Sequence, residues 1–248
     1  MNIPNRGPKK EKYNGMLPVC EIFFSIQGEG RWIGCPAIFI RFQYCNLGCD
    51  YCDTKFAWCE EEKNSSILFK PEKIANDLLS IAPPTRWAGD VPHVVLTGGE
   101  PLLHQDRLPV LIDRLRAKGY TYFELETNGT IVPNQVMLEK ISWWNCSPKL
   151  SNSGIPEQLR FNPKVLYTIA KLENADFKFV VSNNNDLEEI QSTFGSLVKT
   201  DQTMLMPEGS DRQTQLTSMD WVIEQCKDRG YRFTPRLHTI AWDNEKGR

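Results

Sequence analysis

The sequence predicts an α/β protein built as a partial, TIM-like βα barrel of mostly parallel strands. Short β-rich runs alternate with amphipathic stretches, and most of these runs are continuously apolar, as in strands that are buried on both faces. Too few units are present for the eight of a complete barrel. The 248 residues, with 40% hydrophobic and 24% charged side chains, suit one globular domain.

The elements follow from apolar periodicity and from the Pro, Gly and polar residues that bound each run. Strands are predicted at 20–24, 37–42, 93–97, 122–127, 143–147, 176–181, 203–206 and 232–235. Helices are predicted at 71–80, 105–118, 133–140, 163–171, 186–194 and 213–229. In such a sheet the site lies at the carboxyl ends of the strands, so the residues that follow each strand are the first candidates for function.

We expect a mobile head at 1–18, a single domain at 19–242 and a polar tail at 243–248. The head has no apolar core of a signal peptide, and no apolar run is as long as a bilayer span. A formal net charge of −2 gives no global field for nucleic acid. We therefore expect a cytoplasmic protein without a membrane or nucleic-acid partner.

Three cysteines follow the second predicted strand at C-x3-C-x2-C spacing: Cys45, Cys49 and Cys52. In a reducing compartment, clustered cysteines more often bind metal than form disulfides. Zinc, with Cys59 as the fourth ligand, and incidental thiols are the alternatives. Three thiolates on one loop suit a 4Fe-4S cluster in which one iron has no protein ligand. The remaining cysteines have no ligand spacing and are interpreted as ordinary thiols: Cys20, Cys35, Cys59, Cys146 and Cys226.

The cysteine triplet resembles the signature of the radical S-adenosylmethionine (SAM) superfamily. A second motif of that superfamily, Thr97-Gly98-Gly99-Glu100-Pro101, directly follows the apolar run that begins at His93. Taken alone, this motif is an ordinary turn, but its glycines would let the main chain approach a cofactor. The resemblance implies a 4Fe-4S cluster and SAM, which together generate a 5′-deoxyadenosyl radical.

Four further segments resemble the 7-carboxy-7-deazaguanine synthase family, and the likeness runs from about Cys20 to His238. They are 25–30 (SIQGEG), Arg41, 52–54 (CDT) and 147–149 (SPK). The resemblance implies a carbon–nitrogen lyase of the queuosine and tRNA modification pathway, which converts 6-carboxy-5,6,7,8-tetrahydropterin into 7-carboxy-7-deazaguanine and ammonia. It also implies Mg²⁺ and a flavodoxin- or ferredoxin-type reductant, and we expect a homodimer.

The flat pterin requires hydrogen bonds from amide groups at one end and a guanidinium at its carboxylate. The resemblance assigns substrate contacts to Ile26, Gln27, Gly28, Arg41 and Thr97, and Mg²⁺ to Thr54. It assigns cofactor contacts to Tyr51, Cys52, Asp53, Gly99, Ser147, Pro148 and Lys149. Glu100 and Glu126 are expected to be exposed and to bind ribose hydroxyls, and Asn128 to face the mouth of the site.

Each of these residues also has a non-functional interpretation. Residues 27–30 can form a surface turn, Arg41 can belong to a structural ion pair, and Lys149 can be an ordinary solvated lysine. His238 is either a pterin contact or an ordinary histidine. No catalytic residue is assigned beyond the cluster and the cofactor. Two other functions remain open: an activating enzyme for a glycyl radical protein, and a non-enzymatic zinc-binding module.

Overall fold

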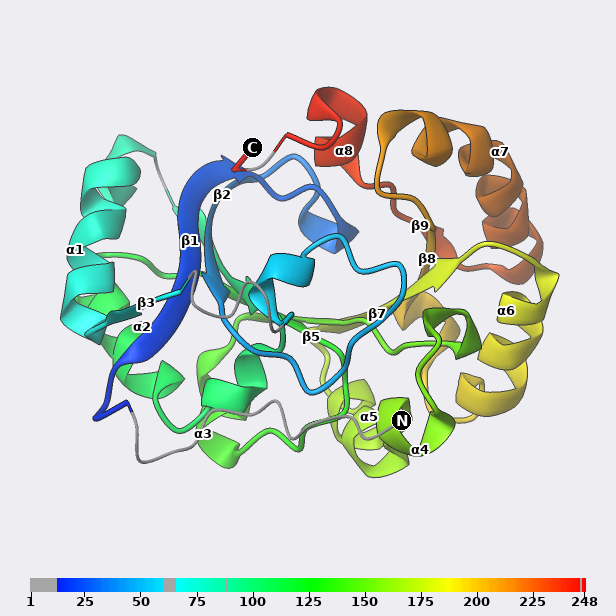
Figure 1. The fold of residues 1–248 in the computed structure, drawn as a ribbon, viewed down its shortest axis with the longest axis horizontal. Coiled ribbons are helices and arrows are strands. Elements are labelled where there is room, and N and C mark those ends of the chain that lie inside the picture. Colours follow the sequence, from blue (N-terminus) through cyan, green and yellow to red (C-terminus); the bar gives the residue numbers. More distant parts are fainter. Residues whose placement is uncertain (1–12, 60–65, 88, 246) are drawn as a thin grey trace.

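The computed structural model describes residues 13–59, 66–87, 89–245 and 247–248. Within them, one curved sheet has the strand order β3-β1-β2-β4-β5-β6-β7-β8-β9, and helices cover its outer face (Figure 1). The strands are β1 Leu17–Ile26, β2 Pro36–Phe42, β3 Ile67–Phe69, β4 His93–Gly98, β5 Phe123–Thr127, β6 Trp143–Cys146, β7 Ala175–Val181, β8 Thr203–Pro207 and β9 Arg232–Phe233. The α-helices are α1 Pro71–Ile81, α2 Leu108–Ala117, α3 Gln135–Lys140, α4 Glu157–Arg160, α5 Pro163–Ala170, α6 Asn184–Glu189, α7 Arg212–Arg229 and α8 Leu237–Trp242.

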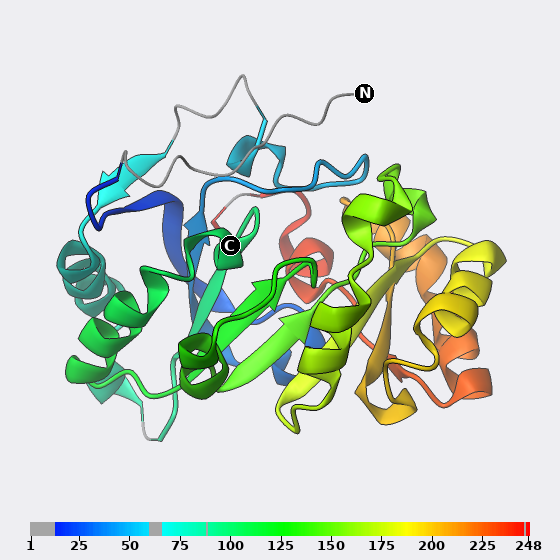
Figure 2. The ribbon, with the colours of Figure 1, turned by 90° about the horizontal axis from the view of Figure 1, so that it is seen from below.

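All pairings from β2 to β9 are parallel, whereas β1 is antiparallel to both β2 and β3. The strands therefore form the open, mostly parallel sheet that the sequence predicts. Because their carboxyl ends share one edge, the loops after β2, β4, β5 and β6 converge there. These loops carry the cysteine triplet, the Gly-Gly-Glu turn and the 147–149 segment (Figure 2).

Helix α5 shows how the outer layer is held. Its N-terminus is capped by Asn162, whose side chain accepts from the Val165 amide, and Pro163 occupies the first turn. Val165, Leu166 and Ile169 recur at helical spacing and are buried in the main core. Burying each of these side chains stabilises the fold by about 1.5–3 kcal/mol. Substituting one of them by Ala would leave a cavity beneath the helix.

The structure differs from the prediction at several elements. Strand β1 begins at Leu17, inside the expected head, and its residues are mostly half-buried rather than buried on both faces. Tyr13 is also buried, and the rest of the head, residues 1–12, lies outside the described residues. β3, α4 and α8 were not predicted, because each is short. The predicted helix at 186–194 is α6 followed by a π-helical turn over Ile190–Phe194.

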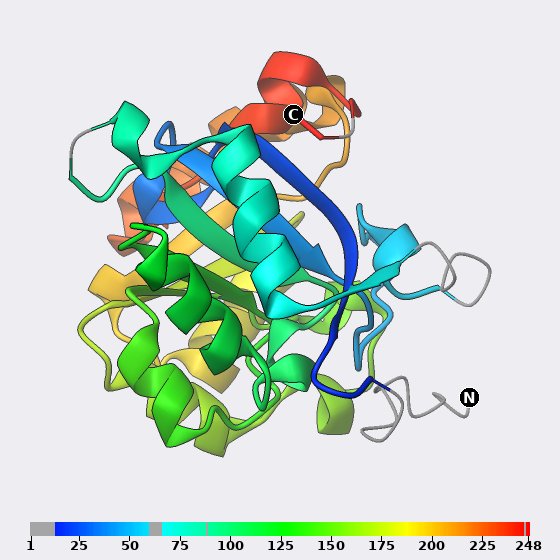
Figure 3. The same cartoon turned by 90° about the vertical axis from the view of Figure 1, so that its left-hand side faces the viewer.

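The loop between β1 and β2 connects the first strands of the sheet with β7 and with the C-terminal segment. The β1–β2 loop places Arg31 against the buried carboxylate of Asp176 on β7, with two N–O distances of 3.1 and 3.3 Å. In the same loop, Gly30 N donates to Thr234 Oγ1, and Gly28 O accepts from Leu237 N at the start of α8. Figure 3 shows the flank of the sheet away from β7, where β1 lies beside α1, with α8 at the top of the view. Within the described chain, no helix has the length and apolarity needed to cross a membrane.

Candidate active site

One cavity of about 310 Å³ lies at the carboxyl edge of the sheet and brings most of the predicted site residues together. The side chains of Asn128 and His238 also reach it. The predicted cluster, cofactor and substrate residues that line it are Ile26, Gln27, Gly28, Arg41, Cys45, Cys49, Tyr51, Cys52, Asp53, Thr54, Thr97, Gly99, Glu126, Ser147 and Lys149. Glu100 and Pro148 do not line it.

The cysteine loop leaves β2 through Tyr44, whose backbone adopts a positive φ of 79° and whose amide donates to Ala57 O at 2.7 Å. All three thiols line the cavity. Burial raises the pKa of Cys45 to about 12 and also raises the pKa of Cys49. Trp58 Nε1 donates to Cys52 Sγ at 3.1 Å. These thiols become good ligands only when a metal displaces their protons.

The donor set fits an iron–sulfur cluster better than a single metal ion. Among the described residues, no three His, Cys, Asp or Glu side chains gather closely enough to hold one ion. In a 4Fe-4S cluster each thiolate binds a different iron, so three separated thiols on one loop meet its needs. Cys45, Cys49 and Cys52 are therefore the residues that can hold the cluster.

Gly98, the last residue of β4, and Gly99 let the main chain pack against the end of β2 and the start of the cysteine loop. A Cβ on Gly98 would lie 2.2 Å from Phe42 O, and a Cβ on Gly99 would lie 2.1 Å from Tyr44 O. Gly98 also has a φ of 145°, which L side chains rarely adopt. The paired glycines thus allow two main chains to touch, and they bring the Gly99 backbone to the cavity wall.

The expectation that Glu100 is exposed is wrong. Its side chain is 0% exposed, and its carboxylate accepts hydrogen bonds from Thr127 Oγ1, Leu102 N and Asn128 N at 2.7–3.1 Å. Burial outweighs these donors and raises the pKa of Glu100 to about 7. Glu100 therefore ties the turn after β4 to the end of β5, beneath the cavity.

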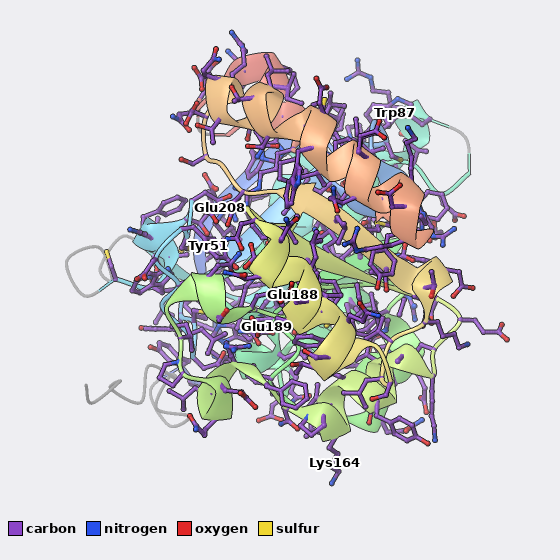
Figure 4. All side chains as sticks on the ribbon, turned by 90° about the vertical axis from the view of Figure 1, so that its right-hand side faces the viewer. Tyr51, Trp87, Lys164, Glu188, Glu189 and Glu208 are labelled. Carbon is purple, nitrogen blue, oxygen red and sulfur yellow. The ribbon has the colours of Figure 1, made fainter. Side chains whose placement is uncertain are left out.

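Pro148 is buried in the segment after β6 and does not line the cavity. Its neighbours do reach the cavity, where Lys149 Nζ donates to Ser147 Oγ at 3.0 Å. This segment is clamped by Arg160, which donates to Lys149 O and forms an ion pair with Glu189 Oε1 at 2.6 Å. Figure 4 shows Glu189 beside Glu188 on α6.

The cavity floor holds a buried ion network that the sequence analysis missed. Lys178 on β7 is only 2% exposed, and its Nζ lies 2.7 Å from Glu29 Oε2 and 2.8 Å from Glu126 Oε2. Gln27 Nε2 donates to Glu124 Oε2 at 2.9 Å and to Glu126 Oε1 at 3.5 Å. A lysine in the apolar β7 run was the available signal, because such a residue is rarely buried without anionic partners.

The two carboxylates of this network differ in their titration. Burial raises the pKa of Glu126, and the charge of Lys178 offsets that effect only in part. For Glu29, burial is outweighed by the charges of Lys178, Arg236 and His238, which hold its pKa well below the usual range. The network therefore contains one firmly ionised carboxylate and one that takes up a proton more readily than an ordinary glutamate.

The C-terminal segment forms the remaining wall. Arg236 is buried and pairs with Asp53 Oδ2 at 3.1 Å and with Glu29 Oε1 at 3.5 Å. His238 packs so closely on Gly28 that a Cβ there would lie 2.1 Å from its Nδ1. The tail after α8 reaches the same cavity through Asp243, Asn244, Glu245, Gly247 and Arg248. The sequence carries no local signal for Arg236.

Arg41 interrupts the apolar β2 strand as a half-buried side chain, and its Nε donates to Glu21 Oε1 at 2.6 Å. Arg41 thus forms an ion pair within the sheet and also lines the cavity. The main-chain groups of Gln27 are already used, because its N–H donates to Cys35 O and its carbonyl accepts from Gly34 N. Among the described residues, Gly28 N–H has no hydrogen-bond partner.

Comparison with known proteins agrees with this geometry. Residues 39–142 match the Radical SAM superfamily. The chain is 36% identical to 7-carboxy-7-deazaguanine synthase of Pyrobaculum aerophilum, covering 93% of this chain and 96% of the relative. It is 33% identical to the Escherichia coli enzyme of that name, with 89% and 96% coverage.

The crystal structure of QueE from Escherichia coli superposes with a TM-score of 0.67 and 26% identity, covering 93% of this chain and 99% of that one. Both the sequence relatives and the solved structure extend over nearly the whole chain. The chain therefore belongs to the 7-carboxy-7-deazaguanine synthase family of radical SAM enzymes.

Proposed function

We propose that this chain converts 6-carboxy-5,6,7,8-tetrahydropterin into 7-carboxy-7-deazaguanine and ammonia, as a carbon–nitrogen lyase of the queuosine pathway. The family supports this reaction through the names of its members. One observation of the structure carries the assignment: a single cavity brings together the three cysteines, the Gly28 main chain and the Arg41 guanidinium. The groups that suit the cluster, the amide-like edge and the carboxylate thus border one cavity.

Cys45, Cys49 and Cys52 hold a 4Fe-4S cluster in this proposal, and SAM lies against Tyr51, Asp53, Gly99 and the segment 147–149. When bound, these groups supply a 5′-deoxyadenosyl radical that removes a hydrogen atom from carbon. The chain's own part is to position the reactants and to exclude water, because a primary radical attacks whatever lies nearest. The ion pair of the buried Arg236 with the more exposed Asp53 supports this by fixing the residue next to Cys52.

For the pterin, we assign the main chain of Ile26 and Gly28 to the amide-like edge and Arg41 to the carboxylate. Within the described chain, the Gly28 N–H has no hydrogen-bond partner and can donate to the substrate. The Gln27 side chain instead donates to Glu126 and orients that carboxylate. Thr97 lies at the end of β4 opposite Arg41 in the strand register and lines the same cavity. The amide-like edge of the pterin would thus contact the end of β1 and the residues after it, and its carboxylate would contact Arg41 on β2.

Glu126 and Lys178 supply the acid–base part of the reaction. Loss of ammonia requires that a ring C–H proton be removed and that the departing nitrogen gain a proton. The raised pKa of Glu126 suits a carboxyl that takes up the first proton and returns one to nitrogen. Lys178, held by the ionised Glu29, keeps Glu126 in place while its charge changes.

Thr54 is proposed as the protein ligand of Mg²⁺. Its hydroxyl is a hard oxygen donor on the cavity wall, 3.7 Å from Cys52 Sγ, and the substrate carboxylate can share the ion. We further propose a flavodoxin- or ferredoxin-type reductant, a homodimer, a cytoplasmic location and a product that serves tRNA modification. Thr54→Ala should lose the stimulation of turnover by added Mg²⁺ while keeping the cluster absorbance.

The proposal is tested by incubating the anaerobically reconstituted, reduced protein with SAM and the carboxytetrahydropterin, and by analysing the products chromatographically. We expect 7-carboxy-7-deazaguanine and ammonia. Cofactor cleavage without deazaguanine would refute the substrate assignment and favour an activating enzyme. Zinc with no labile sulfide would refute the radical chemistry itself.

A matched pair of variants locates the substrate. Arg41→Ala should abolish turnover with an unchanged cluster spectrum, whereas Arg229→Ala, at the exposed end of α7, should leave turnover intact. Persistent turnover in Arg41→Ala would refute the carboxylate-anchoring role of Arg41.

A further inference from the structure

Glu21 lies next to Arg41 and has no role in the function proposed above. The two residues are partners across the antiparallel β1–β2 ladder, so their side chains leave the sheet on the same face. Glu21 Oε1 accepts from Arg41 Nε at 2.6 Å, and both side chains line the cavity while remaining only partly exposed. The short distance is typical of a charge-assisted hydrogen bond.

The contact leaves one edge of the guanidinium available. Glu21 takes the Nε side, while Phe23 and Phe56 lie 6.0 and 5.9 Å from the guanidinium carbon. Within the part of the chain that the structure describes, neither terminal Nη nitrogen of Arg41 has a hydrogen-bond partner. The three neighbours therefore hold the plane of the guanidinium and leave its Nη1–Nη2 edge for a ligand.

Arg41 borders the cavity together with its two register partners, Glu21 on β1 and Thr97 on β4. A ligand in the cavity can therefore reach the guanidinium. A carboxylate in the plane of the guanidinium can accept two parallel N–H bonds from the Nη1–Nη2 edge, whereas a tilted one can accept only one.

We propose that Glu21 is a positioning residue that sets the cavity's selectivity for pterins bearing a carboxylate, by orienting the Nη1–Nη2 edge of Arg41 toward the ligand. This inference rests on the proposed role of Arg41 as the carboxylate anchor. Glu21 has a second effect of opposite sign: its negative charge repels the substrate carboxylate and weakens binding. A single substitution would mix the two effects, so two are needed.

Glu21→Gln and Glu21→Ala separate them, because both remove the charge but only glutamine keeps an Oε1 acceptor for Arg41 Nε. The probe is oxidised 6-carboxypterin, which has no hydrogen at C6 to abstract, compared with pterin lacking the carboxylate. Binding is measured anaerobically by the quenching of pterin fluorescence on reconstituted protein with SAM. Glu188→Ala, on the exposed surface of α6, is the matched control (Figure 4).

We expect Glu21→Gln to bind 6-carboxypterin at least as tightly as the unmodified chain, and Glu21→Ala about tenfold more weakly than Glu21→Gln, the loss of one orienting charge-assisted bond. Both variants should bind unsubstituted pterin equally. In turnover assays the loss in Glu21→Ala should be in KM for the pterin rather than in kcat. If Glu21→Ala misfolds, it should lose binding of both pterins and of SAM. Glu21→Asn then replaces it, because the shorter asparagine side chain does not reach Arg41 Nε.

Equal binding of 6-carboxypterin by Glu21→Gln and Glu21→Ala overturns the inference. If the unmodified chain prefers the carboxylated ligand and Arg41→Ala loses that preference, such equality refutes the role of Glu21 alone. If the unmodified chain shows no preference for the carboxylate, both this inference and the proposed role of Arg41 fail.

Discussion

Replacing Lys178 by Met tests the buried ion network most directly. Methionine has nearly the same shape but no charge, so Glu29 and Glu126 would face each other on the cavity floor without their common cation. Removing one partner of a buried ion pair costs about 3–5 kcal/mol, because the remaining charge is left desolvated. Lys178 is 2% exposed and serves two carboxylates, so we expect the upper part of that range at pH 8.

The loss should shrink as the pH falls. In the unmodified chain the pKa of Glu29 is held low, so its contribution to stability is present above the ordinary carboxyl pKa. Without Lys178 the folded-state pKa of Glu126 rises further above the unfolded value and that of Glu29 rises as well, although Arg236 still lowers it. Protonation of Glu126 then relieves the repulsion as the pH falls. The difference in unfolding free energy between the two proteins should therefore be clearly smaller at pH 5.5 than at pH 8.

Urea unfolding of the apoprotein, followed by circular dichroism, measures this difference. Lys227→Met, an exposed lysine that pairs with Glu224 on α7, is the control and should unfold like the unmodified chain at both pH values. Adding Glu126→Gln to Lys178→Met should restore part of the stability. A stable Lys178→Met protein, or a loss that does not change with pH, would refute the description of the cavity floor as a coupled ion network.

Two further predictions concern the frame of the site. Burial lowers the pKa of His104 to about 4, so the folded state favours the neutral imidazole. Below pH 6.5 the unfolded chain binds a proton at His104 that the folded chain does not, and the free energy of unfolding should fall by about 2 kcal/mol between pH 8 and pH 5. Urea midpoints of His104→Gln should depend less on pH in this window, and parallel curves would contradict the assignment. Arg160→Ala should cost about 3–5 kcal/mol by stranding Glu189, and it should speed hydrogen exchange at the Ser151 amide, which donates to Glu189; unchanged exchange would refute the clamp.

The sequence sufficed for the parallel part of the fold because those strands carry their own signal. β7, for example, is buried along its whole length, so a mainly apolar run marks it, and the polar residues from Ser182 onward end it. β3 was missed because it spans three residues, of which Ile67 is 63% exposed. Its strand character comes from pairing with the first residues of β1, and such a contact has no local pattern.

The same distinction explains the site. The cysteine triplet and the turn at Gly99 are local motifs, so spacing was enough to find them. Glu29, Lys178 and Arg236 meet only through the curvature of the sheet, and Lys178 is 149 residues away from Glu29. Glu100 was placed at the right strand end but assigned the wrong environment, because the sequence does not show that three donors of the chain itself enclose its carboxylate.

The ties between the β1–β2 loop and the C-terminal segment also bear on the order in which the protein is made. Gly28 and Gly30, near the start of the chain, are held by Leu237 and Thr234, which leave the ribosome more than two hundred residues later. A nascent chain can already display all three cysteines when it still lacks one wall of the cavity. Protected loading of an oxygen-sensitive cluster therefore has to wait until Thr234 and Leu237 have been synthesised. A chain truncated before Thr234 would carry the three thiols without this wall of the cavity.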